Sequence, residues 1–325
     1  MTSRRMLLVM LICLVPCLAA AQNPLVYVSF LTGAKAGGTN VYQITQSGAQ
    51  LMDTLDRGGG GPVAVDKQQN VYVVQADLGN GGYQQDSAVY MYAPGGTKGT
   101  LLFTAKSFGI ESMTVAADGT FYAGGQVPGT GNTFAVVKFA PPSYSPQVLG
   151  SGENPRYPVG ISLDASGNLF VGWLISDSNY PVGPCNSGCI TELPAGQSTW
   201  QVRLPDLAAN AIVAGPFATT DGSLVFWSGN DGRFDYLETV ASGRNYPSQV
   251  QQLSPTLFNA SNAIIAFNAG GTQLWATGSG LGAGRGTNVV GINYPSGSVA
   301  LSFKVTSPAN LLWISGIGVS PAYFP

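Results

Sequence analysis

The chain has 325 residues and a formal net charge of −2, with 9% charged and 45% hydrophobic residues. The small number of Lys and Arg residues excludes a basic nucleic-acid-binding surface, and the apolar content argues against a disordered chain. Histidine is absent, which excludes Ser-His-Asp triads, Cys-His pairs and His-based metal sites, so a general acid or base would have to be Asp, Glu, Lys or Tyr.

The first 21 residues have the pattern of a secretory signal peptide. Arg4 and Arg5 precede an apolar run from Met6 to Cys17, and Ala19-Ala20-Ala21 supplies a small-residue cleavage site. We therefore expect a secreted or periplasmic protein whose residues 22–325 form a single domain. No second long apolar run follows, so the sequence predicts no stable membrane anchor after cleavage.

A tight hairpin recurs along the chain. In "ISLDASGNLFVGW" (residues 161–173) an apolar run ends in Asp, a short turn follows, and a second apolar run begins. "VAVDKQQNVYVV" (residues 63–74) matches it, and looser copies follow. The residues in the Asp position lie 48 to 55 residues apart and are Asp66, Ala116, Asp164, Thr219, Asn268 and Ser320.

A second series of turns has the same period. Short turns such as "APGG" and "YPSG" recur between apolar runs, and Gly is expected to supply the positive φ that they need. The turn residues are Gly48, Gly95, Ser143, Gly196, Gly243 and Gly297, spaced by 47 to 54 residues. Each repeat therefore contains two hairpins, or four strands.

Six repeats of four strands predict an all-β, six-bladed β-propeller. The chain begins with a strand-like run that has no preceding partner, near residues 25–30, and ends with an innermost strand near residues 314–319. We expect these two segments to pair, so that N-terminal and C-terminal strands close the ring in one blade. A pair of β-sandwiches is the alternative, but it does not explain the incomplete repeats at the two ends.

The pattern GxxxDxxGNLFV at this period resembles NHL-repeat proteins, the gluconolactonase (regucalcin-like) propellers and the virginiamycin B lyase group. The resemblance covers nearly the whole chain after residue 21 and implies a six-bladed propeller. In lactonase-like members an acidic residue, Asn and Asp bind a divalent metal in the central channel. The usual Asp-Gly before the innermost strand is replaced here by Gly61-Pro62, Val159-Gly160 and Ala263-Ile264, and the histidine of the lyase group is absent.

Charged residues concentrate in the loops that form one face of a propeller, where ligands usually bind. Solvation of charges in loops explains any single one of them, whereas the face as a whole is a candidate ligand surface. The ligand-binding candidates from these loops are Glu153, Arg156, Asp231 and Asp235, and other charges there are Asp77, Asp86, Asp177, Asp206, Arg233 and Arg285.

Glu111 in "FGIESMTV" is the first candidate for a channel contact and for a metal ligand. It is expected immediately before an innermost strand, where the other repeats have apolar residues, Gly or Pro. Asn210 and Asn262 lie at similar positions. The alternative is that Glu111 turns outward and pairs with Lys106 or Arg156. No cofactor is firmly implied, and Ca²⁺ or another divalent cation is the one that the resemblance suggests.

Cys185 and Cys189 in "PCNSGC" are the only cysteines left after signal cleavage. Because an exported chain meets oxidising conditions, we expect them to form a disulfide that shapes a loop of the ligand face.

Two classes of function remain open. The first is a non-enzymatic, monomeric binding scaffold that takes a protein or a small ligand through its loop face. The second is a metal-dependent lactonase-like hydrolase with a degenerate site.

Overall fold

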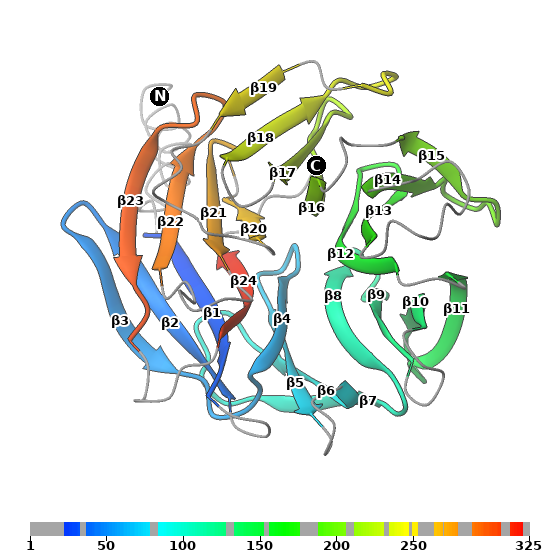
Figure 1. Ribbon diagram of the computed structural model, residues 1–325. Helices are drawn as coiled ribbons and strands as arrows, with labels where there is room; N and C mark the ends of the chain where they lie inside the picture. Colours follow the sequence, from blue (N-terminus) through cyan, green and yellow to red (C-terminus); the bar gives the residue numbers. More distant parts are fainter. Residues whose placement is uncertain are drawn as a thin grey trace, which may run out of the picture.

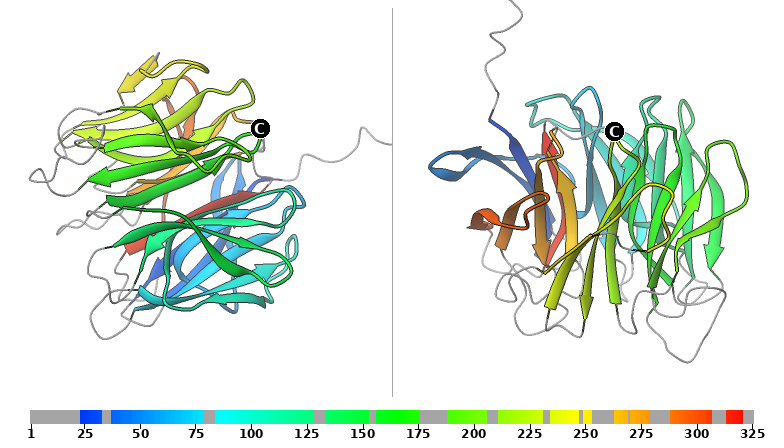
Figure 2. Two further views of the ribbon diagram at one scale, coloured as in Figure 1. Left: turned by 90° about the vertical axis from the view of Figure 1, so that its right-hand side faces the viewer. Right: turned by 90° about the horizontal axis from the view of Figure 1, so that it is seen from above.

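The computed structural model describes residues 23–32, 37–78, 84–127, 133–152, 156–175, 188–205, 211–230, 234–246, 249–252, 263–268, 270–278, 288–306 and 313–320. These residues form six four-stranded antiparallel sheets arranged as blades of a ring, as the sequence predicts (Figure 1). The side views in Figure 2 show the strands running between the two faces of the ring. None of the described residues is helical, and no helix among them is long and apolar enough to cross a membrane.

The first blade contains both ends of the chain. Its order is β24-β1-β2-β3, with bounds Trp313–Ser320, Leu25–Leu31, Gly37–Thr45 and Gly48–Thr54. β24 and β1 are antiparallel, with Leu25 opposite Ser320 and Leu31 opposite Trp313. The predicted closure of the ring by one C-terminal and three N-terminal strands is confirmed.

The other five blades follow the chain, with the innermost strand first. Blade two has β4 (Gly60–Val65), β5 (Val71–Leu78), β6 (Gln84–Tyr92) and β7 (Thr100–Ala105). Blade three has β8 (Gly109–Val115), β9 (Phe121–Gln126), β10 (Phe134–Ala140) and β11 (Ser145–Gly152). Blade four has β12 (Arg156–Leu163), β13 (Leu169–Ile175), β14 (Gly188–Leu193) and β15 (Gln201–Leu204). Blade five has β16 (Ala211–Ala218), β17 (Leu224–Asn230), β18 (Phe234–Val240) and β19 (Gln249–Gln252). Blade six has β20 (Ala263–Phe267), β21 (Gln273–Gly278), β22 (Asn288–Asn293) and β23 (Val299–Lys304).

The turn after each of the first five innermost strands has closely similar hydrogen bonds, which explains the sequence repeat. In blade two the amide of Asp66 donates to the carbonyl of Asn70, and the amide of Gln69 donates to the carbonyl of Asp66. Equivalent pairs occur in blades three to five, and in blade six the Asn268 amide donates to the carbonyl one residue further along, that of Gln273. The residue three positions after the repeat residue has a positive φ, and these residues are Gln69, Gly119, Gly167, Gly222 and Gly271. Gly is favoured at four of the five because it alone takes this conformation without a steric penalty.

The Asp of the repeat caps this turn. One oxygen of Asp66 accepts from the Asn70 amide at 2.8 Å, and the other accepts from the Asn70 side chain at 2.8 Å and the Tyr72 hydroxyl at 2.7 Å. Asp164 binds Asn168 in the same way, but Phe170 stands where Tyr72 would be. Both carboxylates are structural.

Asp66→Ala should destabilise the protein more than Asp164→Ala. The first substitution leaves the buried Tyr72 hydroxyl without its acceptor, which typically costs about 1–3 kcal/mol beyond the lost turn bonds. The difference between the free energies of unfolding of the two variants, measured in urea, gives the cost of the unpaired Tyr72 hydroxyl. Adding Tyr72→Phe to Asp66→Ala should remove most of this cost. Equal losses for the two single variants would contradict the assignment.

The second series of turns is confirmed in five repeats and corrected in one. Gly48, Gly95, Gly196, Gly243 and Gly297 all have positive φ. In the third repeat the positive φ, 50°, falls on Tyr144 rather than on Ser143. The Tyr144 amide donates to the Ala140 carbonyl, so this turn is one residue longer than the APGG turn, in which the Gly96 amide bonds to Ala93.

The core lies between neighbouring blades. Each innermost strand contacts the next one around the whole ring, from β24 to β4, β8, β12, β16, β20 and back to β24. The tryptophans of the second strands fill these interfaces: Trp227 packs with residues of blade six, and Trp275 with residues of β1 and β24. Their role is packing between neighbouring blades.

Candidate functional site

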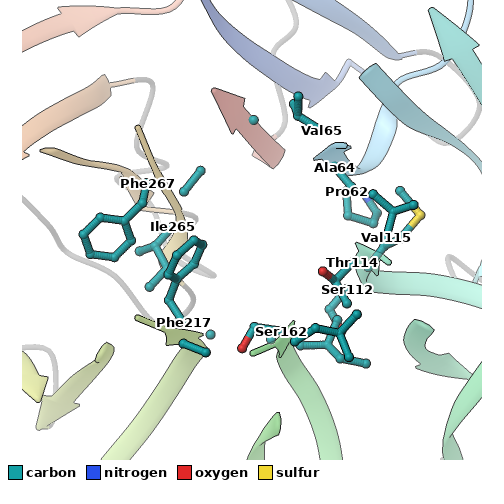
Figure 3. A pocket seen from close by; sticks show the side chains of 18 of the residues that line it. Pro62, Ala64, Val65, Ser112, Thr114, Val115, Ser162, Phe217, Ile265 and Phe267 are labelled. Atoms are coloured by element: carbon teal, nitrogen blue, oxygen red, sulfur yellow. The ribbon is translucent and has the colours of Figure 1, made fainter. Parts of the chain in front are cut away.

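The six innermost strands surround a central cavity of about 440 Å³ (Figure 3). Every one of them contributes residues to its wall. We call this cavity the channel, and the face at which the innermost strands begin the entry face. The lining includes Val63 and Val65 from β4, Met113 from β8, Ile161 from β12, Phe217 from β16, Ile265 from β20 and Ile317 from β24.

Most of the channel wall is apolar, and the hydroxyl groups of Ser112, Thr114, Ser162 and Ser315 interrupt it. Ser112, Thr114 and Ser162 lie on the wall opposite Ile265 and Phe267 (Figure 3). The Ser112 hydroxyl donates to the carbonyl of Pro158 at 3.0 Å and so joins β8 to β12. The Ser162 hydroxyl is buried and has no hydrogen-bond partner among the described residues.

Glu111 lines the channel near the entry face because the strand bulges there. It is the third residue of β8, not the residue before the strand as the sequence suggested. Its neighbours Ile110 and Ser112 pair with consecutive residues Gly125 and Gly124 of β9, so Glu111 itself has no opposite residue. A β-bulge of this kind redirects a side chain and often occurs next to a functional site.

Bulges near this level also occur in β4, β12, β16 and β24, and they show what is unusual about Glu111. Val159 in β12, Gly215 in β16 and Ser315 in β24 have no opposite residue. The expectation that other repeats have apolar residues, Gly or Pro there is therefore wrong for Ser315, whose hydroxyl lies 3.3 Å from the Ser29 hydroxyl. Among these bulge residues, Glu111 is the one with a charged side chain.

Burial raises the pKa of Glu111 to about 7. The side chain is exposed to the channel, but the protein around it replaces part of the bulk water that would stabilise the charge of the carboxyl, and this raises its pKa. Among the described residues no salt bridge or hydrogen bond compensates the loss, and Lys106 forms no ion pair with it. Glu111 therefore faces the channel, and the alternative that it turns outward and pairs with Lys106 is wrong.

Glu111→Gln should stabilise the protein at pH 8 and have little effect near pH 4.5. The folded-state pKa lies above the unfolded one, so the folded state binds more protons between pH 4.5 and 7 and loses stability as the pH rises through this window. The glutamine variant has no such loss. Thermal unfolding of both proteins from pH 4.5 to 8 measures the difference.

Glu192→Gln provides the matched control for this experiment. Its carboxylate lies 3.8 Å from Nε of Arg203, so its removal should lower stability at pH 8, if only slightly. A pH-independent difference between Glu111→Gln and wild type would show that the Glu111 carboxyl is not desolvated.

Two further titratable residues line the described part of the channel, both beyond the ends of innermost strands. Lys67 follows β4 and Asp164 follows β12, each in the first turn of its blade. Their turns lie five to six residues along the strands from the level of Glu111, which corresponds to about 15–20 Å. The two ends of the channel therefore have different charges.

Most of the other predicted site residues cannot be placed relative to the channel. Asn210, Asn262, Glu153 and Asp231 lie outside the described residues. Arg156 begins β12 and Asp235 lies in β18, but their side chains are not among those described.

The predicted disulfide also involves a residue outside the described part, since Cys185 is not in it. Cys189 is fully buried in β14, opposite Trp173 of β13. The Cys185–Cys189 pairing stays a prediction.

The described residues contain no group of three or more Asp, Glu, Cys or His side chains that could hold a metal ion. Glu111 would be a single carboxylate ligand, whereas Ca²⁺ takes six to eight oxygens. Any metal site at Glu111 would therefore need further ligands from beyond the described residues.

Sequence reasoning missed Lys67, Ser162 and Ser315 as channel residues. All three lie in or directly after innermost strands, so aligning the repeats on Asp66 and its counterparts would have included them among the candidates. An alignment of the repeats does not show which side chains face the channel, because their direction depends on how each strand bulges and packs on the next blade.

Comparison with solved structures places this architecture among known propellers. TolB from Acinetobacter baumannii matches with a TM-score of 0.64 at 10% identity, over 92% of this chain and 66% of that one, so the chain spans just under two thirds of TolB. A protein of unknown function from Bacteroides caccae matches with a TM-score of 0.57 at 11% identity, over 91% and 98% of the two chains. A candidate 6-phosphogluconolactonase from Bacteroides fragilis matches with a TM-score of 0.54 at 11% identity, over 90% and 85%.

The likeness establishes the fold alone. Identities of 10–11% leave open which side chains are shared, and function depends on those side chains. No family model matches the chain, and a search of curated proteins finds no match either. Membership of the NHL-repeat or gluconolactonase families therefore stays a hypothesis.

Proposed function

We propose that this protein is an exported, non-enzymatic binding scaffold whose ligand occupies the channel. The observation that carries the proposal is the combination of a mostly apolar cavity with one carboxyl group that has no partner among the described residues. A pocket of about 300–1,000 Å³ with a few polar groups is typical of small-molecule sites.

Export is part of the proposal and rests on the N-terminal sequence. The basic residues, apolar run and alanine cleavage site of residues 1–21 support it. The likeness to TolB supports the fold only. Mass spectrometry of the protein recovered from the periplasm or the medium should give a chain that starts at Gln22.

A ligand screen with a blocked channel tests the binding function. Small molecules of varied charge are screened by thermal shift against wild type and Thr114→Trp, in which an indole replaces a side chain on the channel wall. We expect a subset to stabilise wild type and to lose this effect in the variant. Urea unfolding establishes whether the variant is folded, and Ser162→Phe serves as a second block. Ligands that stabilise both blocked variants as strongly as wild type would contradict the proposal.

A divalent-metal hydrolase of the lactonase type is the second candidate. The raised pKa of Glu111 favours it, because a general base works best near the operating pH. Calorimetric titration with CaCl₂ and with ZnCl₂, followed by a lactone screen, separates the two functions. Metal binding that Glu111→Gln abolishes, together with lactone hydrolysis, would favour the enzyme. Absence of both would leave the binding scaffold.

A further inference from the structure

The channel wall is complementary to one class of ligand, a cation attached to an apolar body. Glu111 lies near the entry face, and apolar side chains continue from its level toward the other face. Each half of this arrangement would gain from a ligand, since the Glu111 carboxylate lines the channel without a described cation beside it and the apolar wall contacts water.

The apolar half is built on the side of the ring away from β8. In Figure 3, Phe217, Ile265 and Phe267 lie across the channel from Ser112 and Thr114. The rings of Phe217 and Phe267 pack with centroids 4.7 Å apart, and Phe267 is buried behind the wall. A hydrocarbon or aromatic group of the ligand would be in contact with Phe217 and Ile265, which are only half-buried.

The charged half depends on which charges face Glu111. Among the described lining residues, Lys67 follows β4 and Asp164 follows β12. Both lie at the end of the channel away from Glu111. The lining residues of β16, β20 and β24 include no titratable group. Asp164 is bonded to the amides of Ser166 and Asn168. No described cation therefore neutralises Glu111 from within the channel.

A metal ion fits this site poorly, and an organic cation fits it well. Divalent cations need several oxygen ligands, and next to Glu111 the described wall supplies hydroxyls and apolar groups. An organic ammonium needs only one carboxylate as its charge partner, and its hydrocarbon part gains free energy by leaving water.

We propose that the channel binds an organic ammonium compound with an apolar body, its nitrogen paired with Glu111 and its hydrocarbon part against Phe217 and Ile265. This inference rests on the proposed binding function and specifies its ligand class. The ammonium group must meet an ionised Glu111, so affinity follows the ionised fraction of this carboxyl. Because the pKa of Glu111 is about 7, affinity should fall about 30-fold between pH 8 and pH 5.5.

Isothermal titration calorimetry with matched probes tests the ligand class. The cationic probes are butylamine, hexylamine and 2-phenylethylamine, and the controls are 2-phenylethanol and 3-phenylpropionate, which keep the apolar body but are neutral or anionic. Each is titrated at pH 8 and pH 5.5 into wild type, Glu111→Gln and Thr114→Trp. We expect the amines to bind wild type at pH 8, more tightly as the apolar body grows, and to lose at least tenfold in affinity in Glu111→Gln.

The outcomes separate the ligand class from the binding function. If the neutral or anionic probes bind as tightly as the amines, and Thr114→Trp abolishes their binding, the channel is a ligand site but the ammonium assignment is wrong. If amines bind equally to wild type and Glu111→Gln, the carboxyl is not their partner and the proposal is overturned. If no amine binds at millimolar concentration, the proposal is likewise overturned, and the wider ligand screen alone decides the binding function.

Discussion

Deleting residues 313–325 should abolish cooperative folding of the protein. The deletion removes β24, which pairs with β1 along its length and closes the ring between blades six and two. Ile314, Ile317 and Val319 are almost fully buried, and their burial contributes together up to about 5–9 kcal/mol. Since a whole domain is stable by only about 5–15 kcal/mol, and β1 would become an unpaired edge, little stability would remain.

A shorter deletion that retains β24 provides the control. A chain ending at Ser320 should unfold in urea with a transition close to that of the full chain, while a chain ending at residue 312 should show none. Circular dichroism and urea titration distinguish them. A cooperative transition with an unchanged midpoint in the longer deletion would show that the ring does not need the C-terminal strand.

Replacing Gly160 should have the second largest effect on stability. A Cβ atom at this position would lie 2.0 Å from Cα of Gly215 and 2.4 Å from its nitrogen. The clashing atoms belong to the backbone of β16, which cannot rotate away, and Gly215 itself has a φ of 42° that favours glycine. Gly160→Ala must push blades four and five apart, and we expect a loss of about 3 kcal/mol or more.

Gly270→Ala is the matched control, because its nearest neighbour would be Oγ1 of Thr272 at 3.4 Å. Urea unfolding should show a small effect for this variant and a large one for Gly160→Ala. Gly160 lies in the innermost strand β12 and lines the channel. The comparison of the two variants therefore tests whether β12 and β16 must lie as close together as they do in the structure. Equal stability of the two variants would mean that blades four and five can separate freely.

The fold could be predicted because its determinants are local. The turns at Asp66 and Asp164 have the same hydrogen bonds, and a polar or small residue at the strand end followed by a short turn, in four of five cases with Gly at the positive φ, is visible in the sequence. The incomplete repeats at both ends indicated the closing blade. The turn at Tyr144 was misplaced by one residue because the length of a turn depends on its backbone path as well as on its residue types.

The site could be predicted only in part. Glu111 was identifiable because a carboxylate near the start of an innermost strand differs from the residues of other repeats. Its place within a bulge, shared with Val159 and Ser315, depends on pairing with the next strand. The hydrogen bond from the Ser112 hydroxyl to the Pro158 carbonyl depends on the contact between β8 and β12, whose residues are far apart in the sequence.

Titration of the Glu111 carboxyl carbon by ¹³C NMR tests the central claim most directly. The claim is that this carboxyl lies in a desolvated channel without a cation of the protein beside it. Comparison with Glu111→Gln assigns the signal, and the pH is varied from 3 to 9. We predict an apparent pKa of about 7 that falls when 2-phenylethylamine is added. A pKa near 4.5, unchanged by the amine, would show that Glu111 is solvated or already paired, and would contradict the account.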